Sequence, residues 1–166
     1  MPDFSEKTVA ELETLLGNYR RLGKERSENY LALLAERERR AVNKDQLLVD
    51  RSLDLLKQAA RGKMYVTYGD LAKASEQRWS NTIRARMSGP GGHLDRLLDI
   101  CHGQGLPLLT ALCVNEAGRQ TGVLDSPAKA GFVSGARRLG RLVTDDDEFY
   151  QTCQRECFIW GSAQPD

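Results

Sequence analysis

The chain has 166 residues, of which 40% are hydrophobic and 28% charged, and its formal net charge is +1. This length and balance are typical of a globular protein with one real core and a helical addition. No apolar run is long enough to span a bilayer, and the first residues lack the apolar core of a signal peptide. We therefore expect a cytoplasmic protein without membrane contacts.

The charges are unevenly distributed along the chain. Lys and Arg outnumber Asp and Glu over residues 20–63 and 101–143, whereas residues 144–166 are acidic. A net charge near zero gives little general attraction to the phosphates of nucleic acids, which are the main source of affinity. A basic middle and an acidic end are nevertheless compatible with one positive face.

Four cysteines, Cys101, Cys113, Cys153 and Cys157, show no spacing typical of a secreted disulfide framework. Reduced thiols buried in the core are the expected state. Together with His102 they could form a zinc site, but the sequence has no Cys-x-x-Cys pair. We predict no metal and no cofactor.

Residues 1–42 are predicted to form a helical hairpin. Thr8 and Glu11 have the spacing of a capping box, Gly23 interrupts the pattern, and Ser27 begins a second helix. The apolar stripes of both helices are narrow. The hairpin should therefore pack on the middle of the chain or, alternatively, on a second copy in a homodimer.

Residues 43–125 form the predicted central domain. Its first helix is expected to start at Asn43, with Gln46 three residues later, and to end at Gly62. The segment Tyr65–Thr67 is β-prone and leads into a helix capped by Thr67 and Asp70. A second short helix is expected from Ser80 to Met87.

The glycine-rich loop Gly89–Gly92 separates that helix from a third one, in which Leu94, Leu97, Leu98 and Cys101 form an apolar stripe. The run Leu106–Val114 and a return run Thr121–Leu124 predict a β-hairpin. Three helices and a terminal hairpin are the elements of a winged helix. The predicted class is thus mainly α with a small β-hairpin: a winged helix-turn-helix core with an N-terminal helical hairpin and C-terminal helices.

Residues 126–166 are predicted to form C-terminal helices packed on the core. One helix is expected over Ala130–Val143, and Thr144 is expected to cap the last helix in a box with Asp147. The acids at 145–148 match the preference of a helix dipole for negative charge in its first turn, which favours a structural role over metal binding.

The central domain resembles the DNA-binding domain of alkylguanine-DNA alkyltransferases and their non-catalytic alkyltransferase-like relatives. The motif VTYGDLA at 66–72 and the Val114-Asn115 pair with a following glycine carry this resemblance. It implies that Tyr68 pushes on the phosphate of a flipped nucleotide and that Arg84 fills the gap in the duplex. Where that family has Pro-Cys-His-Arg, or Trp for Cys, this chain has Leu-Thr-Ala-Leu at 109–112, so we expect no alkyl transfer.

The candidate nucleic-acid-binding residues lie on three predicted elements. Two of them, Arg84 and Arg86, are only two residues apart and cannot share one helix face. Trp79 has an alternative role as a core residue. The full set comprises Tyr68 and Lys73 on the first helix of the motif, Arg78, Trp79, Arg84 and Arg86 before or on the second, and Asn115 and Arg119 at the tip of the wing.

The preferred functional prediction is a non-catalytic protein of prokaryotic or phage origin that binds duplex DNA and senses a modified or flipped base. A first alternative is a protein-interaction module, with a regulatory, defence or counter-defence role, built on the same scaffold. A second is an enzyme acting on nucleic acid, which requires Cys113, His102 and Thr110 to converge in one pocket. The sequence shows no recognised catalytic constellation, which favours a protein without enzymatic activity.

Overall fold

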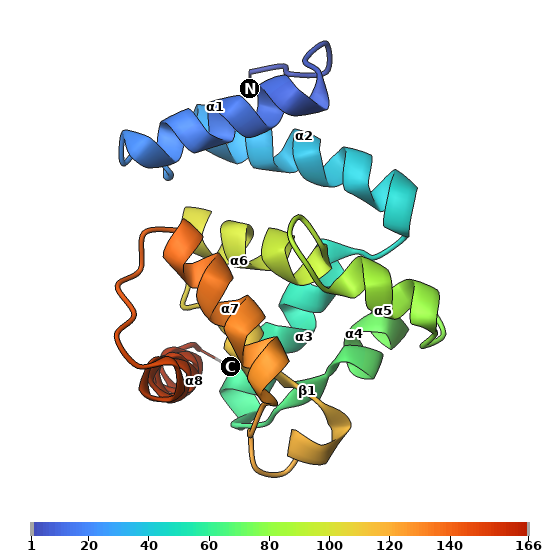
Figure 1. Cartoon of the computed structure of the whole chain (residues 1–166), viewed down its shortest axis with the longest axis vertical. Coiled ribbons are helices and arrows are strands. Elements are labelled where there is room, and N and C mark those ends of the chain that lie inside the picture. The colour runs from blue at the N-terminus through green and yellow to red at the C-terminus, as the bar shows by residue number, and fades with distance from the viewer. Residues whose placement is uncertain (1, 166) are drawn as a thin grey trace.

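The computed structural model describes residues 2–165, except for the side chains of Asn43 and Asp45. It confirms the mainly α class, since the chain is mainly helical with one small β element (Figure 1). No helix in this part of the chain has the length and apolarity needed to cross a membrane. In chain order the elements are α1 (Val9–Arg21), α2 (Glu28–Asp45), α3 (Val49–Gly62), β1 (Val66–Thr67), α4 (Tyr68–Ala74), α5 (Asn81–Met87), α6 (His93–Gly103), the 3-10 helix η1 (Leu109–Leu112), β2 (Cys113–Val114), the 3-10 helix η2 (Glu116–Gly118), α7 (Ser126–Arg138) and α8 (Asp146–Ser162).

Two apolar clusters support the fold. The smaller one joins α1 and α2, and its buried residues are Leu12, Leu16, Tyr30, Leu33 and Leu34. The larger one draws on α3 to α8, so the C-terminal helices share a single core with the central domain. The α1/α2 hairpin lies across α6 (Figure 1), and Ile100 of α6 packs against both clusters. The hairpin thus has an intramolecular docking site, whose contacts with α6 include ion pairs.

Four predicted helix starts are confirmed by their caps. Thr8, Ser27, Thr67 and Ser80 each accept a hydrogen bond from the backbone N–H three residues later, which satisfies one of the donors left open at a helix N-terminus. Thr8 and Thr67 form complete capping boxes, with Glu11 and Asp70 as the reciprocal acceptors. Local side-chain chemistry therefore decides where these helices begin.

The predicted helix start at Asn43 is wrong. Helix α2 continues to Asp45, and α3 begins only at Val49. The cap residue of α3, Leu48, provides no side-chain cap, but the Leu48 N–H donates to Ser75 Oγ at 2.8 Å, so a side chain from after α4 satisfies this open backbone donor. The left-handed residue that ends α3 is Lys63, with φ 52°, rather than Gly62.

The C-terminal helices also differ from the prediction. Helix α7 starts after the cap Asp125 and ends at Arg138, ahead of Gly140, whose φ of 86° reverses the chain. The prediction Ala130–Val143 was therefore displaced towards the C-terminus. Helix α8 is capped by Asp145 instead of Thr144, since Asp145 Oδ1 accepts from the Glu148 N–H at 2.8 Å.

The predicted β-hairpin wing is wrong. Strand β2 pairs in parallel with β1, with Val66 opposite Cys113 and Thr67 opposite Val114, and the segment before β2 is the 3-10 helix η1. The expected return run forms no strand. The reason lies in α8, because its Tyr150 hydroxyl and Gln154 amide donate to the Ala111 carbonyl at 2.7 and 3.0 Å. These bonds satisfy a backbone acceptor that a hairpin partner would otherwise take.

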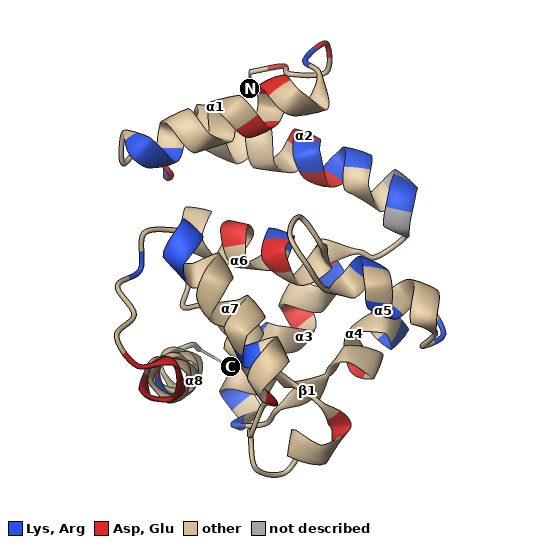
Figure 2. Ribbon diagram, in the orientation of Figure 1, with Lys and Arg blue, Asp and Glu red and all other residues tan. Residues whose placement is uncertain are grey.

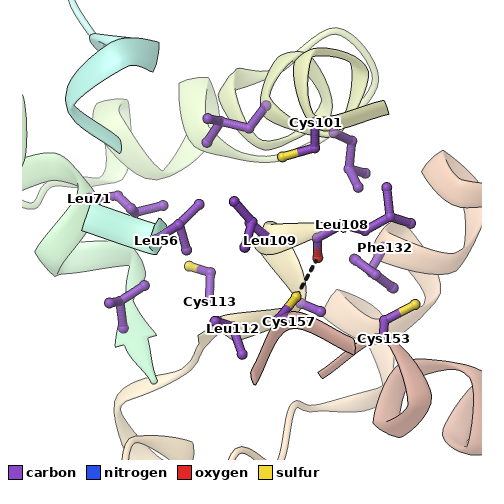
Figure 3. Close-up of a cluster of buried hydrophobic side chains, with 14 of the residues drawn as sticks. Leu56, Leu71, Cys101, Leu108, Leu109, Leu112, Cys113, Phe132, Cys153 and Cys157 are labelled. Atoms are coloured by element: carbon purple, nitrogen blue, oxygen red, sulfur yellow. Dashed lines mark hydrogen bonds between the residues drawn. The ribbon is translucent and has the colours of Figure 1, made fainter. Parts of the chain in front are cut away.

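The four cysteines lie buried in the larger cluster and form no disulfide (Figure 3). The Cys157 thiol donates to the Leu108 carbonyl at 3.5 Å, and burial raises the pKa of Cys101 to about 12. Among residues 2–165, no three or more His, Cys, Asp and Glu side chains gather as a metal site would require. The thiols thus behave as packing groups.

Candidate nucleic-acid interface

The structure brings four of the eight candidate residues to one groove, which we call the Tyr68 groove. It has a volume of about 980 Å³ and lies between the start of α4, α5, η2 and the start of α7. Tyr68, Trp79, Arg84 and Asn115 all line it. The capping box at Thr67 positions Tyr68, because it fixes the first turn of α4.

Tyr68 and Trp79 form an aromatic pair in this groove. Their ring centroids are 6.3 Å apart and their planes differ by 19°. Trp79 is 47% exposed, so the alternative that it fills the core is wrong. Tyr68 is half-buried, and this burial, with smaller contributions from Cys113 and Asp125, raises its pKa, so the hydroxyl stays protonated near neutral pH. An exposed aromatic ring beside a neutral phenol forms a platform on which a base can stack.

Arg84 is exposed on the face of α5 that lines the Tyr68 groove. Two carboxylates, Glu116 and Asp125, line the same groove, but both have partners. Glu116 forms an ion pair with Arg119 at 2.9 Å, and Asp125 caps α7 through the Ala128 N–H. Among the described residues that line this groove, Arg84 is the single Lys or Arg, so the groove is not strongly basic.

Arg119 does not line the Tyr68 groove. Its guanidinium donates to Asp70 Oδ2 at 2.8 Å, to Glu116 at 2.9 Å and to Thr67 Oγ1 at 3.3 Å. Burial would raise the pKa of Asp70, but the bonds from Arg119 and the Thr67 N–H outweigh it and lower this pKa below its ordinary value of 3.8. Arg119 thus fastens the segment after β2 to the first turn of α4.

We expect Asp70→Asn to lower the free energy of unfolding at neutral pH by about 1 to 2 kcal/mol, because the Asp70 side chain is 31% exposed and solvent weakens the pair. Because the pKa of Asp70 is lower in the folded state, ionised Asp70 stabilises the fold at pH values above the ordinary carboxyl pKa. This stabilisation is lost as the pH falls and the carboxylate becomes protonated. The difference between variant and wild type should therefore shrink between about pH 5 and about pH 3 in urea titrations. The control is Asp54→Asn, which changes an exposed carboxylate on α3. If the difference in unfolding free energy between Asp70→Asn and wild type stayed the same at low pH, the stabilising role of the Asp70–Arg119 pair would be contradicted.

The remaining candidates lie outside the Tyr68 groove. Lys73 at the end of α4 and Arg78 in the connection to α5 are exposed to solvent. Arg86 lines a second groove on the other side of α5. The expectation that Arg84 and Arg86 occupy different faces is thus confirmed.

A separate cavity of about 520 Å³, the inner pocket, adjoins the Tyr68 groove. Tyr68, Ser88, Pro127 and Ala128 line both cavities. Most of the inner pocket is apolar, with Leu94, Leu98, Leu124 and Phe132 among its lining residues. Tyr68 therefore stands between an open groove and an apolar chamber.

Two of the three residues required by the enzyme alternative line the inner pocket. Thr110 and Cys113 meet there, whereas His102 lies elsewhere, with Nε2 3.2 Å from Glu25 Oε1. Burial raises the pKa of Cys113, and the nearby Asp70 adds to this effect, so the thiol stays protonated. The Thr110 hydroxyl is buried and has no hydrogen-bond partner among residues 2–165. The pocket is thus bordered by a threonine whose hydroxyl has no partner, and its described lining residues include no histidine to act as a base.

The residues with which α7 lines the inner pocket were not predicted from the sequence. Gly131, Ser134 and Gly135 line it, together with Arg138. Small residues at positions i, i+3 and i+4 on one helix face would have been the available signal. A Cβ at Gly135 would lie 2.7 Å from Leu98 Cδ1, so this glycine lets α7 approach α6 closely, whereas beyond the backbone of α7 no atom lies within 4 Å of a Cβ at Gly131.

Comparisons of the chain with protein-family models, curated proteins and solved structures gave no match. The resemblance to the alkyltransferase DNA-binding domain therefore rests on the residues quoted above.

Proposed function

We propose that this protein binds duplex DNA without covalent chemistry and receives a flipped base in the inner pocket. The observation that carries the proposal is the place of Tyr68, which lines both the Tyr68 groove and the inner pocket. A nucleotide leaving a duplex held in the groove would pass this ring. The role that the resemblance implies for Tyr68, pressing on the phosphate of such a nucleotide, fits that position.

The inner pocket has the properties of a base-binding site. Its volume of about 520 Å³ lies within the range of about 300 to 1,000 Å³ found for small-molecule sites. Its apolar walls favour a planar ring, and the unpartnered Thr110 hydroxyl can bond to a polar edge of a base. A buried hydroxyl without a partner costs stability, and a ligand that supplies one removes this cost.

The Tyr68 groove supplies groups suited to the rest of the duplex. Trp79 can stack on an unpaired base, and Arg84 can occupy the space that a flipped base leaves or contact a phosphate. The Asn115 side chain accepts from the Asp125 N–H at 3.3 Å, which leaves its amide donors available. The parallel β1–β2 pair and the bonds of Arg119 to Asp70 and Thr67 hold the segment of Asn115 against the start of α4, which carries Tyr68.

The proposed function includes no catalysis because the described lining of the inner pocket contains no activated nucleophile. A nucleophilic cysteine needs a lowered pKa, usually from a neighbouring base, whereas burial raises the pKa of Cys113. Binding and sensing require only the shape of the pocket and its hydroxyl.

The test is binding of a labelled duplex at two salt concentrations. Wild type should bind, with an affinity that falls steeply with salt, because phosphate contacts release counterions. Tyr68→Ala and Arg84→Ala should each weaken binding by about tenfold, or about 1.4 kcal/mol. Trp79 emission gives a second readout, since this ring is exposed in the groove and the other tryptophan, Trp160, is half-buried on α8.

Arg155→Ala provides the matched control, because Arg155 is an exposed arginine on α8 that bonds to Thr152 of the same helix. It should leave the affinity unchanged. Thermal unfolding of Tyr68→Ala separates a loss of binding from a loss of folding. If wild type binds no duplex even at low salt, the proposal fails and the protein-interaction alternative takes its place.

A further inference from the structure

A second groove, which we call the hairpin groove, runs between the α1/α2 hairpin, α5 and the loop before α6. It has a volume of about 890 Å³. Glu13 is its single acidic lining residue among the residues described, against five basic ones. The basic residues are Arg37, Arg40, Lys44, Arg86 and Arg96.

Carboxylates on the inner side hold three of these arginines in place. Arg37 pairs with Asp99 at 2.7 Å, Arg40 with Glu36 at 2.6 Å and Arg96 with Glu38 at 2.9 Å. These carboxylates are 1%, 12% and 14% exposed, so they lie behind the arginines rather than in the groove. Arg37 and Arg40 are half-buried, and since a guanidinium has five N–H donors, each can keep its carboxylate while it donates to a further acceptor. Arg96 is only 4% exposed and also donates to the Gly91 carbonyl, so it contributes positive charge rather than a direct contact.

Lys44 is the most accessible of the five. It is exposed near the C-terminal end of α2, and within the described part of the chain it forms no ion pair. Figure 2 shows Lys and Arg along the C-terminal half of α2 and on α5, which border the groove. The groove therefore combines a preorganised basic wall with one exposed ammonium group.

Helix α5 is the ridge between the two grooves. Asn81, Ala85 and Ser88 line both of them, while Arg84 faces the Tyr68 groove and Arg86 the hairpin groove. A helix with its side chains is about 10 to 12 Å wide, which is about the width of the DNA major groove. A helix seated in a groove of a duplex has one phosphate backbone on each flank.

We propose that the hairpin groove binds the phosphate backbone of the second DNA strand, opposite the strand that enters the Tyr68 groove. This inference rests on the proposed function and assigns the α1/α2 hairpin to the DNA-binding surface. Phosphate contacts provide most of the free energy of DNA binding. The described lining of the Tyr68 groove has Arg84 as its one basic residue, so the hairpin groove would supply the further phosphate contacts that binding needs.

The experiment uses the full chain and a labelled duplex, with phosphate-ethylation interference on each strand. In wild type, ethylation should interfere on both strands. Lys44→Ala should remove the interference on one strand, weaken binding about threefold and reduce the slope of log affinity against log salt by about 0.9. Arg84→Ala should remove interference on the other strand. Lys24→Ala is the matched control, because Lys24 is an exposed lysine in the α1–α2 loop, outside the hairpin groove.

The outcomes separate this inference from the proposed function. Interference on one strand only, or equal binding by wild type, Lys44→Ala and Lys24→Ala, overturns the hairpin groove as a backbone site and leaves base binding intact. Displacement of the duplex by polyglutamate at equal charge concentration assigns the groove to acidic polypeptides and also overturns the inference. Failure of wild type to bind any duplex overturns both proposals together.

Discussion

Replacing Asp99 by Asn is expected to lower the free energy of unfolding by about 3 to 5 kcal/mol. Asp99 on α6 is 1% exposed and lies among three arginines. Its carboxylate is 2.7 Å from Arg37 Nη1 of α2, 2.7 Å from Arg138 Nη2 of α7 and 3.7 Å from Arg20 Nη2 of α1. The 2.7 Å contact with Arg138 is an ion pair without hydrogen-bond geometry. Asparagine has the same shape but no charge, and it leaves three cations without their common partner.

The effect should be largest at the junction between the hairpin and the rest of the chain, because Arg20 and Arg37 are both hairpin residues. Urea denaturation gives the change in the free energy of unfolding. In Asp99→Asn, hydrogen exchange should accelerate relative to wild type more in α1 and α2 than in α3. Asp54→Asn, at an exposed site on α3, should change stability by less than about 0.5 kcal/mol. A loss below about 1 kcal/mol for Asp99→Asn would show that solvent or other acids neutralise these arginines.

Gly161→Ala is expected to lower the free energy of unfolding by about 3 kcal/mol, because Gly161 of α8 lies directly against the backbone of α3. A Cβ at this position would lie 2.3 Å from the backbone C and O of Ala60 and 2.6 Å from the N of Arg61. Backbone atoms cannot rotate away as a side chain can, so the two helices would have to separate. The separation would also disturb the bonds that Tyr150 and Gln154 of α8 donate to the Ala111 carbonyl in η1.

Gly17→Ala provides the opposite expectation with the same chemical change. Gly17 lies in the middle of α1, and beyond the backbone of that helix no atom lies within 4 Å of the place that an alanine methyl group would occupy. Alanine should therefore stabilise the helix by about 0.5 to 1 kcal/mol. Thermal unfolding of the two variants should shift in opposite directions. Equal stability of Gly161→Ala and wild type would mean that α3 and α8 can move apart at little cost.

The positions of most helices could be predicted from the sequence, because their causes are local. Caps such as Thr8, Thr67 and Ser80 act within three residues, and apolar spacing along α6 identifies its buried face. The start of α3 was missed because the acceptor for its first backbone N–H, Ser75 Oγ, comes from another part of the chain, and no pattern near Val49 could show this. At α7 and α8 the caps are local, but Asp125 and Asp145 compete with other polar residues nearby.

The candidate site was predicted in part. The motif around Tyr68 indicated this region, and Trp79, Arg84 and Asn115 line the same groove as Tyr68. Arg119 was misplaced because an arginine in a loop has the same local signal whether it faces solvent or a carboxylate. Its partner Asp70 lies 49 residues away in the chain.

The sequence by itself determined the mainly helical class, the α1/α2 hairpin and the helices of the central motif, since these depend on capping and periodicity over a few residues. Only the tertiary structure decided the parallel β1–β2 pair, the inner pocket and the basic hairpin groove. Each of these depends on contacts between distant segments, such as Ala111 with Tyr150 or Asp99 with Arg138. An apolar run such as 108–114 is compatible with a strand or a buried turn, and the hydrogen-bond partners supplied by α8 select the turn.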